Sequence, residues 1–158
     1  MTADRQKADR PKPPLLDEQL CFALYSAGLA LTKAYRPILE PLDLTYPQYL
    51  VMMCLWQRDG LPVRELGQRL HLDSGTLTPL LKRLEARGLL ARTRDVADER
   101  RVLVTLTDDG RRLGERAAAV PPQVLRASGL SPGEACAERA RLVALRDRLE
   151  AWLGKESS

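Results

Sequence analysis

The chain has 158 residues, enough to bury a substantial hydrophobic core, and we expect one domain rather than two. Its formal net charge of +4, from 25 basic and 21 acidic side chains, permits an anionic partner without requiring one. No apolar run approaches the roughly 20 residues that cross a bilayer, and the start of the chain lacks the apolar stretch of a signal peptide, so we expect a cytoplasmic protein with no membrane partner.

The chain begins with a predicted disordered basic tail at residues 1–14. This segment contains three prolines and many charges but little apolar surface, so it cannot compensate the entropy lost on ordering. Apolar residues at helical spacing then predict a first helix over residues 15–36, which Pro37 ends or kinks. The rest of the chain, residues 15–158, is predicted to form the single domain.

A capping box marks the next helix. Thr45 and Gln48 lie three residues apart in the order that lets each side chain bond the other's backbone N–H, which predicts an apolar helix from Gln48 to about Trp56. Pro62 then begins a short helix, and the segment HLDS forms a turn.

The helix after that turn has leucines at positions i, i+3, i+4 and i+7, namely Leu77, Leu80, Leu81 and Leu84, and Gly88 is its expected end. The apolar period then changes to two in LLARTR and again in RVLVTLT, with the polar stretch DVADER between them, which predicts a β-hairpin. The fold class is therefore mainly α with a small β-hairpin wing, and residues 47–107 form a winged helix-turn-helix.

Two more helices are predicted beyond the hairpin. One runs from about Asp108 to Ala127, and the other is opened by a second capping-box pattern, Ser131-Pro132 followed by Glu134. The last helix carries a stripe of leucines that needs a partner: Leu142, Leu145, Leu149 and Leu153.

Short polar residues at the start of a recognition helix are suited to reading bases in the major groove. Ser74, Thr76 and Thr78 are the candidates for base contacts, because the N-terminal end of this helix points into the groove in helix-turn-helix docking. Lys82, Arg83 and Arg87 lie farther along and are predicted to contact phosphates of double-stranded DNA.

The hairpin tip supplies a third kind of DNA contact. Arg100 is predicted to enter the minor groove with Asp98 orienting its guanidinium, and Arg101 is the alternative. Seven basic and four acidic residues lie between Lys82 and Arg101, so this region holds most of the net charge. Alone, such charges indicate only a solvated surface. Within a winged module they favour DNA binding.

The segments DSGTLTPLLKRLEARGLL and DERRVLVTLTDDG resemble the MarR family of dimeric winged-helix repressors. The segment QLCFALYSAGLALTKAYRPILEPLDLTYPQYLVMMCLW is similar to the branch of organic hydroperoxide-resistance regulators, the OhrR type. Together these similarities cover residues 15 to about 113. The resemblance implies a homodimer on a palindromic operator, with residues 15–36 and 108–154 as dimerisation helices.

The resemblance also implies a redox sensor. In this branch a cysteine early in the first helix reacts with the peroxide and two tyrosines hydrogen-bond to it, which corresponds to Cys21, Tyr35 and Tyr46, with Tyr25 near the pocket. Fourteen residues at about 1.5 Å each separate Cys21 from Tyr35 by roughly 21 Å along one helix. We therefore expect the tyrosine to reach the cysteine from a second, antiparallel subunit.

The three cysteines, Cys21, Cys54 and Cys136, lie far apart in a chain with one histidine, which indicates free thiols, no metal site and no cofactor. Relatives with a resolving cysteine carry it near the end of the fifth helix, where this chain has PPQVLRASGLS and none. A sulfenic acid on Cys21 then pairs either with Cys136 or with a small cellular thiol, while Cys54 is expected to be inert core.

Two functions remain open at this stage. The first is a repressor that releases its operator when an organic hydroperoxide, the expected inducer, oxidises Cys21. The alternative is a MarR-type repressor that responds to a non-covalent small apolar or phenolic ligand. An enzyme is not expected, because the sequence lacks the recycling pair and activating cluster of a thiol peroxidase.

Overall fold

The computed structural model describes residues 12–98 and 100–156, so most of the predicted tail at residues 1–14 lies outside the described residues. The chain forms two compact units, residues 1–33 and 34–158. The described part of the first unit holds the short 3-10 helix η1 (Leu16–Glu18) and the larger part of α1 (Leu20–Leu39), and α1 continues into the second unit.

Helix α1 starts later and ends later than its sequence predicts. It begins at Leu20 rather than near residue 15 and runs through Pro37 to Leu39. A proline this close to the C-terminal end removes only one helical hydrogen bond, so two further residues remain helical. Many large apolar side chains of α1 are exposed, among them Leu20, Leu24 and Tyr25.

The second unit continues with the 3-10 helix η2 (Glu40–Leu42) and α2 (Tyr46–Gln57). Gln48 Oε1 accepts the backbone N–H of Thr45 at 2.9 Å, as the predicted capping box requires. Helix α2 begins two residues before Gln48 because Pro47 fits in the first turn, where a backbone N–H has no helical partner.

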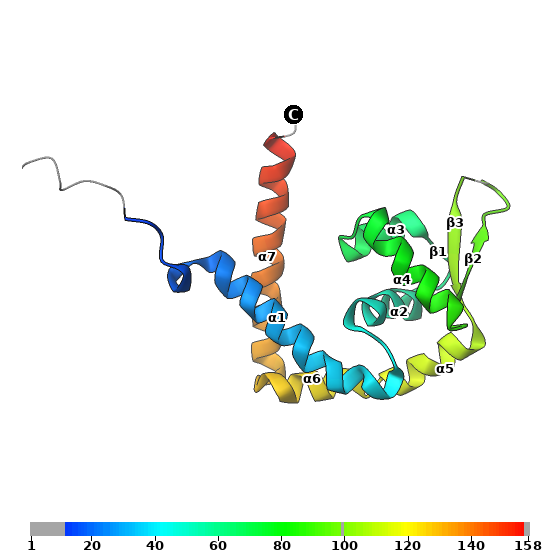
Figure 1. Ribbon diagram of the computed structural model, residues 1–158, viewed down its shortest axis with the longest axis horizontal. Coiled ribbons are helices and arrows are strands. Elements are labelled where there is room, and N and C mark those ends of the chain that lie inside the picture. Colours follow the sequence, from blue (N-terminus) through cyan, green and yellow to red (C-terminus); the bar gives the residue numbers. More distant parts are fainter. Residues whose placement is uncertain (1–11, 99, 157–158) are drawn as a thin grey trace, which may run out of the picture. The chain divides into compact units, whose positions relative to one another are not determined.

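The winged helix-turn-helix is confirmed (Figure 1). Its elements are α3 (Val63–Leu70), α4 (Ser74–Ala86), β2 (Leu90–Arg94) and β3 (Val102–Leu106). A further strand, β1 (Leu61–Pro62), pairs with β3 and gives an antiparallel sheet in the order β1-β3-β2. The sequence analysis missed β1, because two residues are too few to show a strand period.

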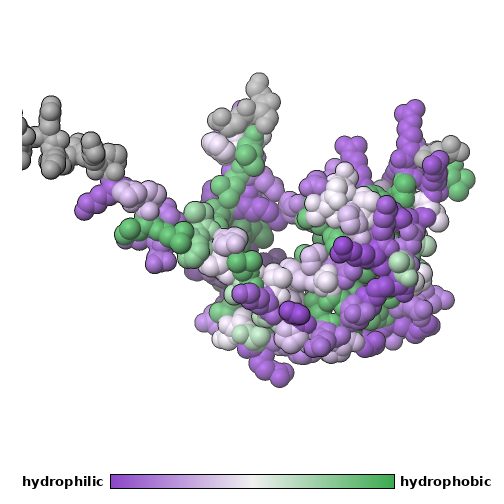
Figure 2. All heavy atoms as spheres, in the orientation of Figure 1, coloured by the Kyte–Doolittle hydropathy of each residue, from purple (hydrophilic) through white to green (hydrophobic). Residues whose placement is uncertain are grey.

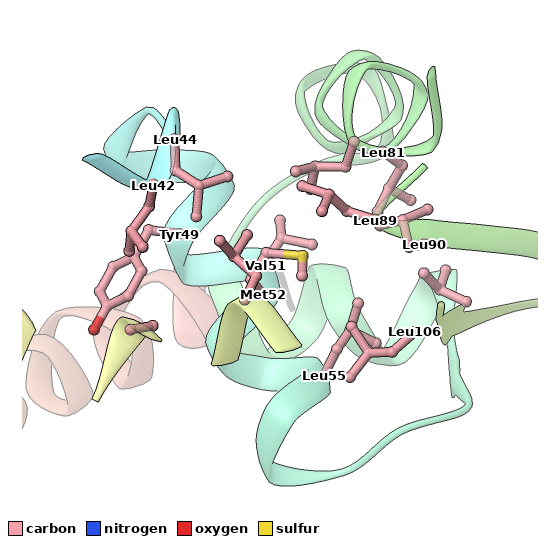
Figure 3. Close-up of a cluster of buried hydrophobic side chains, with 14 of the residues drawn as sticks. Leu42, Leu44, Tyr49, Val51, Met52, Leu55, Leu81, Leu89, Leu90 and Leu106 are labelled. Carbon is pink, nitrogen blue, oxygen red and sulfur yellow. The ribbon is translucent and has the colours of Figure 1, made fainter. Parts of the chain in front are cut away.

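The hydrophobic core of the second unit lies between α2, α4 and the sheet (Figure 3). The predicted leucine stripe of α4 is confirmed, since Leu77, Leu81 and Leu84 are at most 1% exposed and Leu80 packs against the core. These side chains meet Met52 and Leu55 of α2 in the same cluster. The buried stripe leaves the opposite face of α4 in solvent.

The prediction of one helix from Asp108 to Ala127 was wrong, because the segment forms two helices, α5 (Asp108–Ala117) and α6 (Val120–Ser128). Pro121 and Pro122 cannot donate helical hydrogen bonds to the preceding turn, so α5 ends before them. They are tolerated in the first turn of α6.

The last helix, α7 (Pro132–Glu156), opens with the predicted capping box. Ser131 N–H donates to Glu134 Oε2 at 2.8 Å, and the Glu134 N–H donates to Ser131 Oγ at 3.3 Å. Hydrophobic side chains follow one another along α7 (Figure 2), and several are exposed: Leu142, Leu149, Trp152 and Leu153. Within residues 12–98 and 100–156, no helix combines the length and apolar character needed to span a membrane.

Candidate nucleic-acid interface and cysteine site

The first turn of α4 holds polar side chains in solvent. Asp73 caps the helix, since its Oδ1 accepts the Thr76 backbone N–H at 2.8 Å and its Oδ2 accepts the Thr76 hydroxyl at 3.2 Å. These hydrogen bonds hold the pKa of Asp73 below its ordinary value. Ser74 and Thr76 are exposed and Thr78 is half-buried. Two of the three predicted base-reading side chains are therefore open to a ligand at the helix start.

The turn between α3 and α4 depends on a glycine. A Cβ atom on Gly67 would lie 2.9 Å from the backbone oxygen of Leu72, closer than real Cβ atoms approach. His71 turns the chain with a φ of 53°, in the left-handed region. The close approach at Gly67 fixes the start of α4 against α3, which is the geometry a recognition helix needs.

A hollow of about 750 Å³ lies between α3, α4 and the hairpin. Thr78 lines it together with Arg100 and Arg101. The structure therefore brings one predicted DNA-contacting residue of the recognition helix to the same surface as two from the hairpin tip. Arg64 and Gln68 of α3 also line it, and the sequence analysis did not name them. The sequence could have indicated both residues, because they lie four positions apart on the face of α3 opposite the buried Leu66.

The predicted phosphate contacts differ in their surroundings. Lys82 and Arg83 are exposed on α4. Arg87, the C-cap residue of α4, instead has partners within the chain, since its guanidinium donates to the backbone oxygens of Leu42 and Asp43 and pairs with Asp43 Oδ2 at 3.1 Å. The sequence analysis did not anticipate these partners, which lie more than forty residues away.

The hairpin tip is closed by backbone hydrogen bonds. Asp95 N–H donates to Arg101 O, and Arg101 N–H donates to Asp98 O, each at 2.9 Å. Asp98 Oδ1 accepts the backbone N–H of Arg100 at 3.1 Å. The Asp98 carboxylate thus shapes the loop that carries Arg100, whereas the prediction assigned it to the Arg100 guanidinium. Arg100 and Arg101 are both exposed.

One ion pair joins the hairpin to α4. Arg92 of β2 donates from Nε and Nη2 to Glu85 Oε2, at 3.0 and 2.6 Å, and its backbone N–H donates to Glu85 Oε1 at 3.0 Å. The same contacts lower the pKa of Glu85. Three hydrogen bonds to one carboxylate restrict the angle between strand and helix, so α4 and the wing present their side chains as one surface.

Cys21 lies in the first turn of α1, where backbone N–H groups without helical partners attract negative charge. It is exposed, as is Tyr25 one turn later. Cys21 and Tyr35 both belong to α1, fourteen residues apart along the chain.

The predicted sensor tyrosines form a ring cluster in the second unit. The Tyr35 and Tyr46 ring centroids are 4.4 Å apart, and Tyr49, which the sequence analysis missed, lies 5.9 Å from Tyr35. Burial, with smaller effects from Tyr46 and Tyr49, raises the pKa of Tyr35 to about 12, and burial also raises the pKa of Tyr46. Both phenols therefore stay protonated near neutral pH and can donate hydrogen bonds.

The two other cysteines differ in exposure. Cys54 is half-buried against the core of the second unit, and burial raises the pKa of its thiol. Cys136 is exposed near the start of α7, with the Arg139 guanidinium 4.0 Å from its sulfur. Among the described residues, no group of three or more His, Cys, Asp or Glu side chains is placed to hold a metal ion.

Comparison with known proteins points to transcriptional regulators. Residues 33–116 match the family model described as transcriptional regulator SarA/Rot. The chain is 50% identical over 145 residues to the HTH-type transcriptional regulator TtmR of Methylorubrum extorquens, covering 92% of this chain and 74% of that protein. It is also 50% identical over 110 residues to the organic hydroperoxide resistance transcriptional regulator of Bacillus subtilis, covering 70% and 75%.

Solved structures agree in fold. AbfR of Staphylococcus epidermidis is 33% identical, covers 87% of this chain and 93% of its own, and gives a TM-score of 0.73. A structure of reduced AbfR bound to DNA gives a TM-score of 0.72. The PcaV regulator of Streptomyces coelicolor, in complex with its natural ligand, is 27% identical with a TM-score of 0.71, covering 89% of this chain and 98% of its own.

Proposed function

Because this chain belongs to the MarR family of transcriptional regulators, within its OhrR-type branch, we propose that it is a dimeric repressor that leaves its operator when an organic hydroperoxide oxidises Cys21. The observation that carries the proposal is the contact between Tyr35 and Tyr46, two half-buried phenols whose pKa values are raised, so that both stay protonated. Its relatives are regulators rather than enzymes, which supports a binding protein without turnover.

Operator binding is assigned to α4 and the wing. Ser74, Thr76 and Thr78 read base edges in the major groove, and Lys82 and Arg83 contact phosphates. Arg100 or Arg101 enters the adjacent minor groove. The structure of reduced AbfR bound to DNA, a similar protein, supports DNA binding by this fold. A two-fold dimer presents two such surfaces, so the operator is palindromic.

The dimer completes the sensor. The apolar side chains that α1 and α7 leave exposed, such as Leu24 and Leu149, supply the surface for a second copy of the chain. Fourteen residues of one helix keep Cys21 away from the Tyr35 of its own chain. If the α1 of the partner packs antiparallel, the partner's phenol pair lies beside Cys21 instead. Each sensor therefore contains a thiol from one subunit and phenols from the other.

The chemical step is a two-electron oxidation of the thiol. The Cys21 thiolate attacks the outer oxygen of the hydroperoxide, an S–O bond forms, the O–O bond breaks, and the alkoxide takes a proton and leaves as an alcohol. The phenols of Tyr35 and Tyr46 donate hydrogen bonds to the thiolate and hold it in place. The resulting sulfenic acid then condenses with a thiol, either Cys136 or a small cellular thiol, and releases water.

Operator release by defined variants tests the proposal. The probe is a duplex selected by the reduced protein from a randomised pool, and binding is followed by fluorescence anisotropy after one equivalent of cumene hydroperoxide. We expect release from wild type, reversal by dithiothreitol, and continued binding by Cys21→Ser. Cys54→Ser is the control, because Cys54 takes no part in the proposed step, and Cys136→Ser tests whether Cys136 is the thiol that pairs with the sulfenic acid. Release of DNA from the oxidant-treated Cys21→Ser protein would refute Cys21 as the sensor.

The second candidate is a repressor that binds a small phenolic ligand without covalent chemistry. The observation that favours it is the similarity to PcaV, whose structure holds its natural ligand. A simple phenolic acid, 4-hydroxybenzoate, discriminates between the two. If 4-hydroxybenzoate releases the DNA from Cys21→Ser without any oxidant, and cumene hydroperoxide releases no DNA from wild type, the second function is established instead.

A further inference from the structure

The short segment between the two sensor tyrosines is held by arginines from distant elements. Tyr35 lies on α1 and Tyr46 begins α2, and η2 with Asp43 joins the two helices. Leu42 and Leu44 are buried on either side of Asp43 (Figure 3), which adopts a φ of 51°. The Tyr35 and Tyr46 rings, whose centroids are 4.4 Å apart, join α1 to the start of α2 on the two sides of this turn, so a shift of either tyrosine acts on the segment between them.

Arg87 holds the turn from the recognition helix. It is the C-cap residue of α4, and its guanidinium donates to the backbone oxygens of Leu42 and Asp43 while pairing with Asp43 Oδ2 at 3.1 Å. Its side chain is only 31% exposed, which is low for an arginine on a helix surface. The planar guanidinium can serve two carbonyls and a carboxylate together, which a lysine cannot.

A second arginine holds the same turn from another direction. The guanidinium of Arg116, near the end of α5, donates to the backbone oxygen of Pro41 at 2.5 Å. Three successive carbonyls, those of residues 41, 42 and 43, are thereby bound to α5 and to α4. Of these two helices only α4 carries the predicted base-reading residues.

We propose that Arg87 is a positioning residue that transmits the state of the sensor tyrosines to the recognition helix. The inference rests on the function proposed above and deepens it. A rearrangement of Tyr35 and Tyr46 displaces the turn between them, and Arg87 passes the displacement to the C-terminal end of α4. The helix then moves relative to the groove in which its other end lies.

This role differs measurably from the phosphate contact that the sequence suggests for Arg87. Loss of a phosphate contact reduces the salt dependence of operator binding by about 0.9 in the slope of log K against log salt, whatever the redox state. Loss of a transmitting contact leaves that slope unchanged. It lowers instead the ratio of operator Kd for oxidised over reduced protein, by about 2- to 30-fold for a coupling residue.

The first test compares wild type with Arg87→Gln and Arg87→Lys. The Kd ratio and the salt slope are measured with the selected duplex, and the melting temperature is recorded in parallel. We expect Arg87→Gln to lower the ratio with an unchanged slope, and Arg87→Lys to recover part of it. A lower slope with an unchanged ratio would make Arg87 a phosphate contact. A lower melting temperature with unchanged Kd ratio and salt slope would make Arg87 a structural residue only. Each of these two results overturns the inference.

A second measurement needs no oxidant, so it decides the inference even if wild type fails to respond to hydroperoxide and the proposed function is lost. Hydrogen exchange of residues 40–44 is compared with and without the duplex. We expect DNA to slow exchange there in wild type but not in Arg87→Gln. Arg116→Gln is the matched control: it loosens the same turn but keeps the DNA-dependent slowing. Equal slowing in all three proteins would refute transmission through Arg87.

Discussion

Replacing Gly110 with alanine tests how closely α5 packs against the DNA-binding module. A Cβ atom at Gly110 would lie 2.0 Å from the backbone oxygen of Leu89 and 3.2 Å from Leu106 Cδ2. Ordinary contact begins at 3.4 Å, and the nearest atom belongs to the backbone, so no side-chain rotation removes the clash. The helix has to move by more than 1 Å from Leu89, which precedes the wing.

The expected cost is large for one methyl group. Overpacking of this kind costs about 1–3 kcal/mol and sometimes more, which corresponds to a fall of about 2–4 °C in Tm for each kcal/mol in a domain of this size. Gly133→Ala is the matched control, because nothing lies within 4 Å of its Cβ position in the first turn of α7. We expect this variant to match or slightly exceed the stability of wild type.

Thermal unfolding followed by circular dichroism measures both variants at one protein concentration, since the Tm of the proposed dimer would depend on concentration. Retention of the wild-type Tm by Gly110→Ala would refute the packing argument. A fall for both alanine variants would also refute it, because it would show a general intolerance of alanine rather than a clash with Leu89.

Three further predictions concern named hydrogen bonds and pKa shifts. Trp56→Phe removes the indole N–H that donates to Gly110 O at 2.9 Å, and chemical denaturation should show a loss of about 1 kcal/mol. Asp73 has a lowered pKa in the folded protein, so its contribution to stability is present above its unfolded pKa and is lost as pH falls. Asp73→Asn should flatten the acid limb of a plot of Tm against pH, and an unchanged limb would contradict this. Tyr35 has its pKa raised from 10.0 to about 12, so the folded state favours the neutral phenol and stability declines as pH rises between those values. Tyr35→Phe should reduce that alkaline decline and remove the latest part of the phenolate absorbance titration.

Local sequence signals predicted most of the fold. The leucines of α4 and the capping boxes before α2 and α7 act within one or two helical turns, so their spacing alone identifies them. The break between α5 and α6 was also encoded locally, by Pro121 and Pro122, and the predicted helix from Asp108 to Ala127 ran through both prolines. Strand β1 has only two residues and depends on pairing with β3.

Contacts between distant residues were beyond the reach of such signals. Tyr35 and Tyr46 were identified by resemblance, whereas the participation of Tyr49 depends on how α1 packs on α2. The charge of Arg87 suggested a phosphate partner, and only the fold places the carbonyls of Leu42 and Asp43 within its reach. A charged residue on a helix surface cannot be assigned to solvent, DNA or its own chain from spacing alone.

The restraints on the DNA-binding module limit how a switch can operate. Glu85 and Arg92 fix the wing to α4, and Gly67 and Gly110 allow backbone contacts too close to admit a side chain. An element held this tightly resists internal rearrangement, because each clash or lost hydrogen bond adds to the cost. Under the proposed function, oxidation therefore displaces α4 and the wing together and leaves their mutual geometry unchanged. The turn at η2, which is bound to α4 through Arg87 and flanked by both sensor tyrosines, is the place where such a displacement begins.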